Sequence, residues 1–237
     1  RPRTMAQWAL ASADMLVGNF ADAIEKADDA LRICLSPVDR VAAGGYRGAA
    51  VALSGKGHED GRAITGIMRE LRRKSCYMMM PAINMALGVG KVIQGEMAAG
   101  VRAVEAARDE GENWDMIGMD GMSDLFLGET YMQMAFSKEK PPLSVILGNL
   151  PFLLRTLPFA KAKARRHLQS ALDNYRTLDM PTSIARCQYV LALLDQAARK
   201  DDRARTRLME AREIAVSVEA SHIVRDADAV LAELDAD

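Results

Sequence analysis

The feature of this sequence that most constrains its fold is a turn pattern that returns at a nearly constant interval. Gly18, Lys56 and Gly95 each begin a turn segment, and they are 38 and 39 residues apart. In each segment a bulkier residue follows two positions later, and Ala or Gly follows five positions later. A flexible turn lets the next helix fold back, and the small residue permits close helix–helix approach. A period just under 40 residues with one helix pair per unit predicts a solenoid.

Between these turns, apolar residues recur at helical spacing, and the breaks fall at Gly, Pro and Asp or Asn clusters. Aromatic residues make up only 5% of the chain, whereas methionine and alanine are frequent, a composition that suits closely packed helices better than a β-sandwich. We therefore predict an all-α fold. The expected helices span residues 4–17, 20–35, 39–55, 59–75, 78–95, 97–110, 115–136, 160–177, 181–199, 202–217 and 221–235.

The turns divide the chain into about five helical hairpins, which we expect to form a right-handed α-α superhelix with a terminal capping helix. With Ala135 and Arg199 as the fourth and fifth turn positions, the last interval is 64 residues, so roughly 24 residues are inserted in the fourth unit. The predicted units are residues 4–37, 38–76, 77–112, 113–179 with an insert at 137–159, and 180–217, followed by a cap at 218–237.

Several of these residues resemble the tetratricopeptide repeat family. Leu127-Gly128-Glu129-Thr130-Tyr131 resembles the Leu-Gly-x-x-Tyr motif of that repeat's first helix. The spacing of its turn and second helix is matched by Gly18, Phe20, Ala23, Ala27 and Ala30, and its small and apolar positions in the fifth unit by Ala192, Ala204, Leu208 and Ala211. The sequence departs from the family pattern at Trp8, which is displaced by one position, and at Lys56, which replaces the turn glycine.

A narrower resemblance covers most of the chain. The order of the repeats, the segment 143–159 and the segments 164–168 and 185–187 resemble the C-terminal repeat region of large bacterial signalling proteins. In those proteins a class III adenylate cyclase domain and an AAA-like signalling ATPase domain precede the repeats. The resemblance implies a regulatory segment of such a protein and does not place cyclase chemistry in this chain. The start at Arg1 without a methionine likewise predicts a fragment with its catalytic part upstream.

Charge and cysteine content narrow the classes of function. The 31 Lys and Arg residues nearly balance 32 Asp and Glu residues, and a net charge of −1 disfavours a nucleic acid or an anionic membrane as partner. Cys34, Cys76 and Cys187 are far apart and odd in number, so we expect neither a disulfide framework nor a metal site, and a cytoplasmic location. No apolar run reaches the length of a membrane span.

One segment superficially resembles a phosphate-binding loop. It is Gly88-Val89-Gly90-Lys91, but Met85 occupies the first glycine position of that motif and Val92 replaces its hydroxyl residue. The segment also falls inside a predicted helix. We therefore interpret Gly88 and Gly90 as residues that allow close helix packing.

The histidines do not form a catalytic or zinc-binding motif. His58, His167 and His222 are dispersed, and neither His-Glu-x-x-His nor Gly-x-Ser-x-Gly occurs in the sequence. We expect His58 in a turn and His167 on a helix surface. The sequence thus predicts no catalytic residue, no metal and no cofactor.

A partner-binding groove is one prediction from the repeat register. Equivalent positions of successive first helices would point to the concave face, and the candidate binding residues there are Trp8, Ser12, Met15, Tyr46, Met85, Leu125, Glu129 and Tyr189. Such a groove suits a partner helix or an extended peptide, with the aromatic residues as anchors. A register slip of one residue would instead place Trp8, Tyr46 and Met85 in the core of the repeats, and both interpretations stay open.

The insert at 137–159 is too apolar for a free loop. Prolines at 141, 142, 151 and 158 interrupt it, so we expect two short helices that start at proline and pack across the repeats. As a dimer or interdomain contact it would use Leu147, Leu150, Phe152, Leu153 and Leu154; the alternative is a lid over the fourth unit. The basic residues that follow, Lys161, Lys163, Arg165 and Arg166, are expected on a solvated face.

The predicted function is therefore binding. We expect a non-catalytic protein-interaction or regulatory repeat domain of a bacterial signal-transduction protein, whose partner is a protein or peptide, the parent's own upstream domains, or a second copy held through the insert. One alternative is a small-molecule effector-sensing domain. The other is an enzyme on an unfamiliar helical scaffold, which would need a cleft of converging His, Asp, Glu or Cys side chains.

Overall fold

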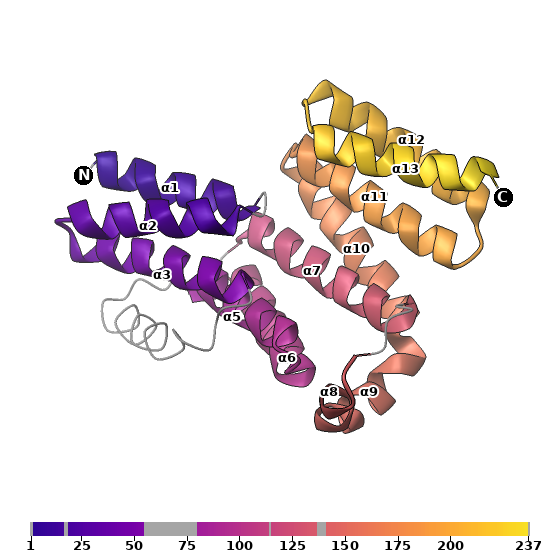
Figure 1. The fold of residues 1–237 in the computed structure, drawn as a ribbon, viewed down its shortest axis with the longest axis horizontal. Helices are drawn as coiled ribbons and strands as arrows, with labels where there is room; N and C mark the ends of the chain where they lie inside the picture. Colours follow the sequence, from indigo (N-terminus) through magenta and orange to yellow (C-terminus); the bar gives the residue numbers. More distant parts are fainter. Residues whose placement is uncertain (1, 17–18, 55–79, 114, 137–140, 237) are drawn as a thin grey trace. The chain divides into compact units, whose positions relative to one another are not determined.

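Every element described in the computed structural model is a helix (Figure 1). The described residues are 2–16, 19–54, 80–113, 115–136 and 141–236. The chain separates into two compact units, Arg1–Glu110 and Gly111–Asp237, which are treated one at a time below.

The first unit contains α1 (Pro2–Leu16), α2 (Phe20–Ile33), α3 (Pro37–Leu53), α5 (Met80–Ile93) and most of α6 (Met97–Glu112). Neighbouring helices pack against each other in chain order, and α1 also contacts α3. Helices α5 and α6 approach closely where glycines face each other, because a Cβ atom at Gly100 would lie only 2.5 Å from the carbonyl oxygen of Gly88. The interpretation of Gly88 as a packing residue inside a helix is confirmed.

The second unit contains α7 (Ile117–Phe136), α8 (Leu143–Gly148), α9 (Leu150–Thr156), a short 3₁₀ helix η2 (Leu157–Phe159), α10 (Ala160–Thr177), α11 (Pro181–Ala197), α12 (Asp201–Ser217) and α13 (Ser221–Ala236). Helix α10 packs against α7 on one side and α11 on the other, and α12 lies against both α11 and α13. Helix α11 therefore occupies the middle of this unit, and its described side chains include eight buried ones.

The all-α prediction is confirmed for the described residues, and the predicted helix bounds agree to within two residues at nearly every end. The two short helices of the insert are also confirmed, since Pro142 precedes α8 and Pro151 lies in the first turn of α9. The predicted turn position Ala135 is wrong, because this residue is still in α7. The helix predicted at 59–75, the turn residues Gly18 and Lys56, and His58 and Cys76 lie outside the described residues. The superhelix and the repeat boundaries stay predictions.

One type of turn follows five of the described helices, namely α5, α6, α10, α11 and α12. Gly95, Asp115, Asp179, Arg199 and Glu219 all have a positive φ, between 50° and 85°. After each of them, the next residue donates its backbone N–H to the carbonyl five residues earlier, as in Lys200 to Asp195 at 2.9 Å. This is the hydrogen bond of a Schellman motif, which ends a helix with a left-handed residue. The predicted turn positions Gly95 and Arg199 are confirmed as two of these residues.

Small residues form the buried face of several helices. In α12 the buried side chains are Ala204, Leu208, Ala211 and Ala215, which recur every three or four residues. This spacing places them on one face of the helix. The same pattern of small residues appears in α2 at Ala23, Ala27 and Ala30. Alanine faces let neighbouring helices approach closely, which accounts for a core with few aromatic residues.

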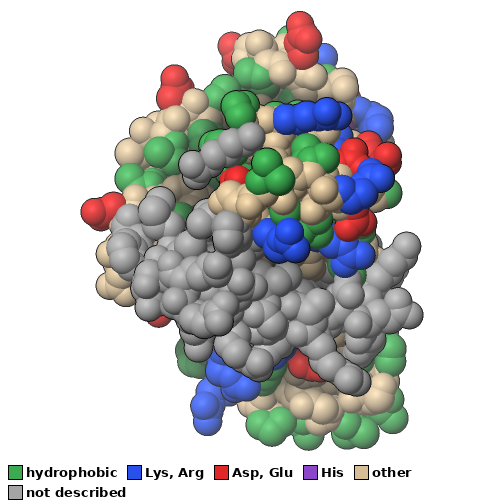
Figure 2. All heavy atoms as spheres, turned by 90° about the vertical axis from the view of Figure 1, so that its left-hand side faces the viewer, with side chains coloured by type: hydrophobic (Ala, Val, Ile, Leu, Met, Phe, Trp, Pro, Cys, Tyr) green, Lys and Arg blue, Asp and Glu red, His purple; other side chains and the backbone are tan. Residues whose placement is uncertain are grey.

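One face of the molecule carries positive and negative side chains next to each other (Figure 2). On the face drawn in Figure 2, Lys and Arg side chains lie among Asp and Glu side chains over the described residues. This mixed surface agrees with the near-zero net charge. A local excess of positive or negative side chains is therefore a departure from this mixed surface.

Candidate functional site

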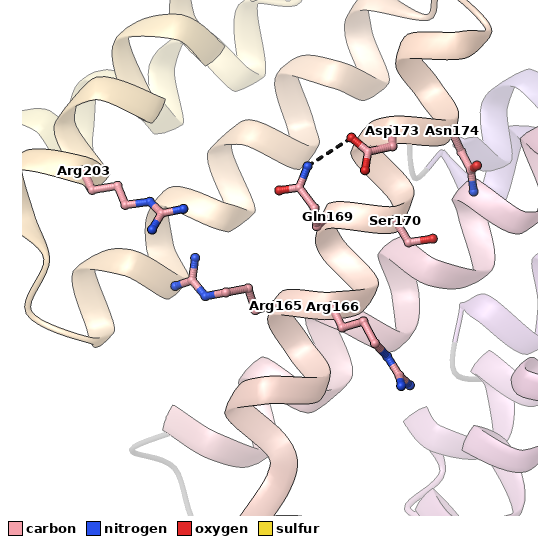
Figure 3. A pocket seen from close by; sticks show the side chains of 7 residues that line it. All are labelled: Arg165, Arg166, Gln169, Ser170, Asp173, Asn174 and Arg203. Carbon is pink, nitrogen blue, oxygen red and sulfur yellow. Dashed lines mark hydrogen bonds between the residues drawn. The ribbon is translucent and has the colours of Figure 1, made fainter.

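A shallow pocket of about 490 Å³ lies in the second unit, over the outer surface of α10 and the start of α12. Its seven lining residues are all of polar or charged types: Arg165, Arg166, Gln169, Ser170, Asp173, Asn174 and Arg203. Six of these residues come from α10, where they recur at positions that share one side of the helix. Figure 3 shows Arg165 and Arg203 on one side of Gln169 and Arg166 on the other. We call this the arginine pocket.

A buried carboxylate positions two of the pocket's arginines. Asp195 of α11 has an exposed fraction of 0%. Its Oδ1 accepts from Nη2 of Arg165 at 2.5 Å, and its Oδ2 lies 3.2 Å from Nε of Arg203 and 3.2 Å from Nε of Arg207. Arg207 also donates to Gln188 of α11. One carboxylate thus joins α10, α11 and α12.

Positive charge exceeds negative charge around this carboxylate. Three guanidinium groups share the single charge of Asp195, and each guanidinium has five N–H donors, more than two carboxylate oxygens can satisfy. Burial lowers the pKa of Arg207, Asp195 raises it, and the nearby Arg203 and Arg165 lower it further. The lining residues include three arginines and one acidic residue, Asp173, which accepts a 3.0 Å hydrogen bond from Gln169. The pocket is therefore suited to an anion.

A second buried polar cluster lies under the same pocket, between α7 and α10. Asp124 of α7 accepts from Ser170 Oγ through Oδ2 at 2.5 Å, and its Oδ1 lies 2.7 Å from Nδ1 of His167. The tautomer with the proton on Nδ1 is the one in which His167 donates to an ionised Asp124. The His167 ring stacks on that of Tyr131, with centroids 5.6 Å apart. The expectation of a surface His167 is wrong: its place on the face of α10 that meets α7 buries it.

This cluster differs from a catalytic triad. In a Ser-His-Asp triad the serine hydroxyl bonds the histidine nitrogen that is remote from the aspartate. Here Ser170 donates to Asp124 itself, and Nε2 of His167 is buried with no hydrogen-bond partner among the described residues. The contacts tie α7 to α10 and fix the Ser170 side of the arginine pocket.

The insert buries polar side chains and exposes large apolar ones, the reverse of the usual pattern. Among residues 143–159 the buried side chains are two polar ones, Asn149 between α8 and α9 and Thr156 at the end of α9. Asn149 Nδ2 donates to the carbonyl of Val145 at 2.8 Å, which closes the junction of the two helices. Six large apolar side chains of the insert are exposed, and the most exposed are Leu143 at 70% and Leu154 at 66%. We call the exposed set the insert surface: Leu143, Leu147, Leu150, Leu154, Leu157 and Phe159.

The predicted insert contacts fall partly on this surface. Leu147, Leu150 and Leu154 are exposed and belong to it, whereas Phe152 and Leu153 are half-buried. Leu143 and Leu147 are four residues apart in α8, as are Leu150 and Leu154 in α9, so each pair shares a helix face. Helices α8 and α9 pack against each other. Figure 1 shows them beyond the N-terminal end of α10.

The predicted groove residues of the first unit include one aromatic pair. The rings of Trp8 in α1 and Tyr46 in α3 stack at a centroid distance of 5.7 Å and an angle of 8°. Both residues are half-buried, as are Ser12 and Met85. Met15 lies in α1, and its side chain is outside the described part. Equivalent positions of two first helices thus meet, but whether they contact a partner stays a prediction.

In the second unit, Glu129 and Tyr189 have partners within the fold. Glu129 of α7 accepts from Nη2 of Arg186 in α11 at 2.9 Å. Tyr189 packs against two buried clusters that join α11, α12 and α13, and burial raises its pKa. Leu125 is half-buried in α7. The role of these residues in a partner groove likewise stays a prediction.

Sequence reasoning missed Asp124, Gln188, Asp195, Arg203 and Arg207. A signal was present, because Gln188 and Asp195 stand seven residues apart on the same helix face as the buried Leu191. A buried polar residue on an apolar helix face requires a hydrogen-bond partner. The basic residue Arg165, expected on a solvated face, is that partner for Asp195.

Comparisons with known proteins give no match: neither a protein-family model nor a curated protein matches this chain. Among the described helices, none combines the length and the apolar character needed to cross a membrane. Within the same described part of the chain, no group of three His, Cys, Asp or Glu side chains could hold a metal ion. Cys34 and Cys187 are buried free thiols.

Proposed function

We propose that this chain is a non-catalytic helical interaction domain that binds another protein through the insert surface. The observation that carries the proposal is the reversed burial of α8 and α9, where Asn149 and Thr156 are buried while large apolar side chains are exposed. Contiguous exposed apolar patches on proteins mark interaction sites. Burying one such side chain contributes about 1.5–3 kcal/mol. Several together supply the anchors of an interface.

The charge around the insert indicates the chemistry of the partner. Between residues 141 and 172 the sequence contains five Lys and Arg residues and no Asp or Glu. Arg155 in α9 and Lys161 at the start of α10 are exposed beside the insert surface. A second copy of the chain would bring like charges together at this rim. We therefore assign the surface to a helix with an apolar face and acidic edges, supplied by a different protein or by an upstream domain of a longer parent chain.

Two further features support this function. The bonds of Ser170 and His167 to Asp124 tie α7 to α10 in an arrangement that does not activate the serine. The buried free thiols of Cys34 and Cys187 agree with a reducing cytoplasm, where we place the interaction. The tetratricopeptide resemblance and the link to cyclase or ATPase signalling proteins supply the regulatory context of the proposal.

The test uses two synthetic amphipathic helices that share a leucine face and differ only in their edges, glutamate in one and lysine in the other. We expect the chain to bind the glutamate-edged helix, and Leu147→Gln combined with Leu154→Gln to weaken binding at least tenfold. The control variant is Met209→Gln, which changes an exposed apolar residue of α12 outside the insert. It should bind like the unchanged chain.

Three outcomes would overturn the assignment. Equal binding of the lysine-edged helix would remove the argument from charge. A dimer in light scattering that the Leu147→Gln and Leu154→Gln pair abolishes would assign the insert surface to a second copy. Binding to vesicles of anionic lipid that the same pair abolishes would assign it to a membrane surface.

A small-molecule sensing domain is the second candidate function. The arginine pocket favours it, because this pocket is polar, carries excess positive charge and lies on α10 and α12 rather than on the insert. The two functions are compatible within one regulatory domain.

A further inference from the structure

We propose that the arginine pocket is a binding site for a phosphomonoester, a small hydroxylated molecule that carries one phosphate group. This inference is independent of the insert surface, which lies on other helices. It depends on the charge of the pocket, on the fixed positions of its guanidinium groups and on its hydrogen-bonding side chains.

The charge of the pocket matches that of a phosphomonoester. Arg165, Arg166 and Arg203 line it together with a single acidic residue, Asp173. Behind them the charges of Asp195 and Arg207 offset each other. The remaining excess is two positive charges, and a phosphomonoester carries about −1.5 to −2 at neutral pH. A single carboxylate would neutralise only half of this excess.

The buried aspartate holds two of the arginines in place before a ligand binds. Each of Arg165 and Arg203 makes an ion pair with Asp195. Their side chains remain 33% and 53% exposed, so N–H donors stay accessible from the pocket. Figure 3 shows the two guanidinium groups facing each other across the space between α10 and α12. Arginines fixed in this way lose little conformational freedom on binding, and their planar fork matches phosphate oxygens.

The remaining lining favours hydroxyl groups on the rest of the ligand. Gln169 donates one amide N–H to Asp173 and Ser170 donates its hydroxyl hydrogen to Asp124, so the side-chain oxygens of both residues remain as acceptors. Asn174 adds an amide group. None of the seven lining residues is aromatic, and the pocket therefore offers no stacking surface for a nucleobase. A volume of about 490 Å³ lies within the usual range for small ligands, about 300–1,000 Å³.

The site is tested by calorimetric titration of the full chain with glycerol 3-phosphate, inorganic phosphate, sulfate and glycerol. We expect glycerol 3-phosphate to bind more tightly than inorganic phosphate, and glycerol not to bind. Arg203→Gln should weaken the binding of glycerol 3-phosphate at least tenfold. Arg203 is more than half exposed, so this variant is expected to keep its fold.

The matched control is Arg212→Gln, which removes the same charge from the same helix outside the pocket, where Arg212 pairs with Asp228. It should bind glycerol 3-phosphate as the unchanged chain does. Arg166→Gln gives a second test, because this exposed lining residue makes no contact with Asp195; we expect a loss of at least threefold. Equal losses in Arg203→Gln and Arg212→Gln would overturn the proposal. So would equal affinities for sulfate and glycerol 3-phosphate, or binding of glycerol alone.

Discussion

The insert and the helices that follow it place opposite kinds of side chain in the interior. In α10–α12 the fold buries a charged residue, Asp195, and surrounds it with arginines, while alanine and leucine fill the helix contacts. In α8 and α9 the fold buries an amide and a hydroxyl and leaves leucines outside. The difference indicates two tasks. Burial in α10–α12 fixes charged groups at defined positions. The insert instead exposes apolar side chains that can contact another molecule.

The two regions should differ in how much their side chains contribute to stability. Residues of α10–α12 that touch the core should be costly to change, because they contribute to packing or neutralise a buried charge. Substituting the exposed leucines of the insert should change the free energy of unfolding only slightly when no partner is bound.

The largest effect is expected from Asp195→Ala. This substitution leaves Arg165, Arg203 and Arg207 close together without their carboxylate. Breaking a buried ion pair by removing one partner costs about 3–5 kcal/mol of unfolding free energy. Urea unfolding followed by circular dichroism measures the loss. The control is Asp228→Ala, which removes an exposed partner of Arg212 and should cost less than about 1 kcal/mol. Equal losses in the two variants would show that Asp195 does not hold the three helices.

Leucine truncation compares the two regions with the same chemistry. Leu168 of α10 is fully buried against α7, and Leu168→Ala should cost about 2–5 kcal/mol. Leu154 of α9 is mostly exposed, and Leu154→Ala should change the unfolding free energy by less than about 0.5 kcal/mol. Both are measured by denaturant unfolding of the same chain. A loss at Leu154 as large as that at Leu168 would mean that the insert surface is covered within the fold.

Replacing glycine by alanine adds volume to a helix contact, whereas truncating leucine removes it. A Cβ atom at Gly128 in α7 would lie 2.6 Å from Cγ of Leu168, so Gly128→Ala should cost about 1–3 kcal/mol through overpacking. At Gly148 in α8 no atom lies within 4 Å of the added Cβ. Gly148→Ala should therefore be neutral or stabilise the helix by up to about 1 kcal/mol. Thermal unfolding of both variants tests this, and a stabilised Gly128→Ala would contradict the close contact of α7 and α10.

Much of the fold follows from local patterns in the sequence. The helix bounds of α10, α11 and α12 are predictable because Ala164, Leu168 and Ala171 repeat at helical spacing and because Pro181 starts a helix. The turn predicted at Arg199 is present, although arginine is an unusual residue at positive φ. These features depend only on neighbours in the chain.

The arginine pocket is not predictable in the same way. Arg165 and Arg166 are adjacent in the sequence, but Arg165 pairs with Asp195 while Arg166 lines the other side of the pocket. Which arginine meets the carboxylate depends on how α10 is rotated against α11, a tertiary contact between residues 30 positions apart. His167 illustrates the same limit. It follows two arginines in the sequence, and only the contact between α7 and α10 explains its burial.

The smallest effect concerns Cys187, a buried thiol of α11, and appears at alkaline pH. Burial raises the pKa of Cys187 from 9.0 to about 12, Glu129 adds to the shift and Arg186 opposes it. In the unfolded chain this thiol ionises near pH 9, whereas in the folded chain it stays protonated. Its contribution to stability is therefore complete below pH 9 and is lost as the pH rises from 9 toward 12.

Denaturant unfolding of the native chain and of Cys187→Ala at about pH 8 and pH 10 isolates this contribution. The native chain should lose about 1 kcal/mol more than the variant between the two pH values, because alanine has no proton to release. Other groups that ionise in this range, such as Tyr175, whose pKa burial also raises, contribute to both proteins and cancel in the difference. An identical pH dependence in the two proteins would mean that water reaches Cys187. The buried face of α11 would then be open to solvent, as the insert surface is. The difference in burial between the two regions would not hold at this position.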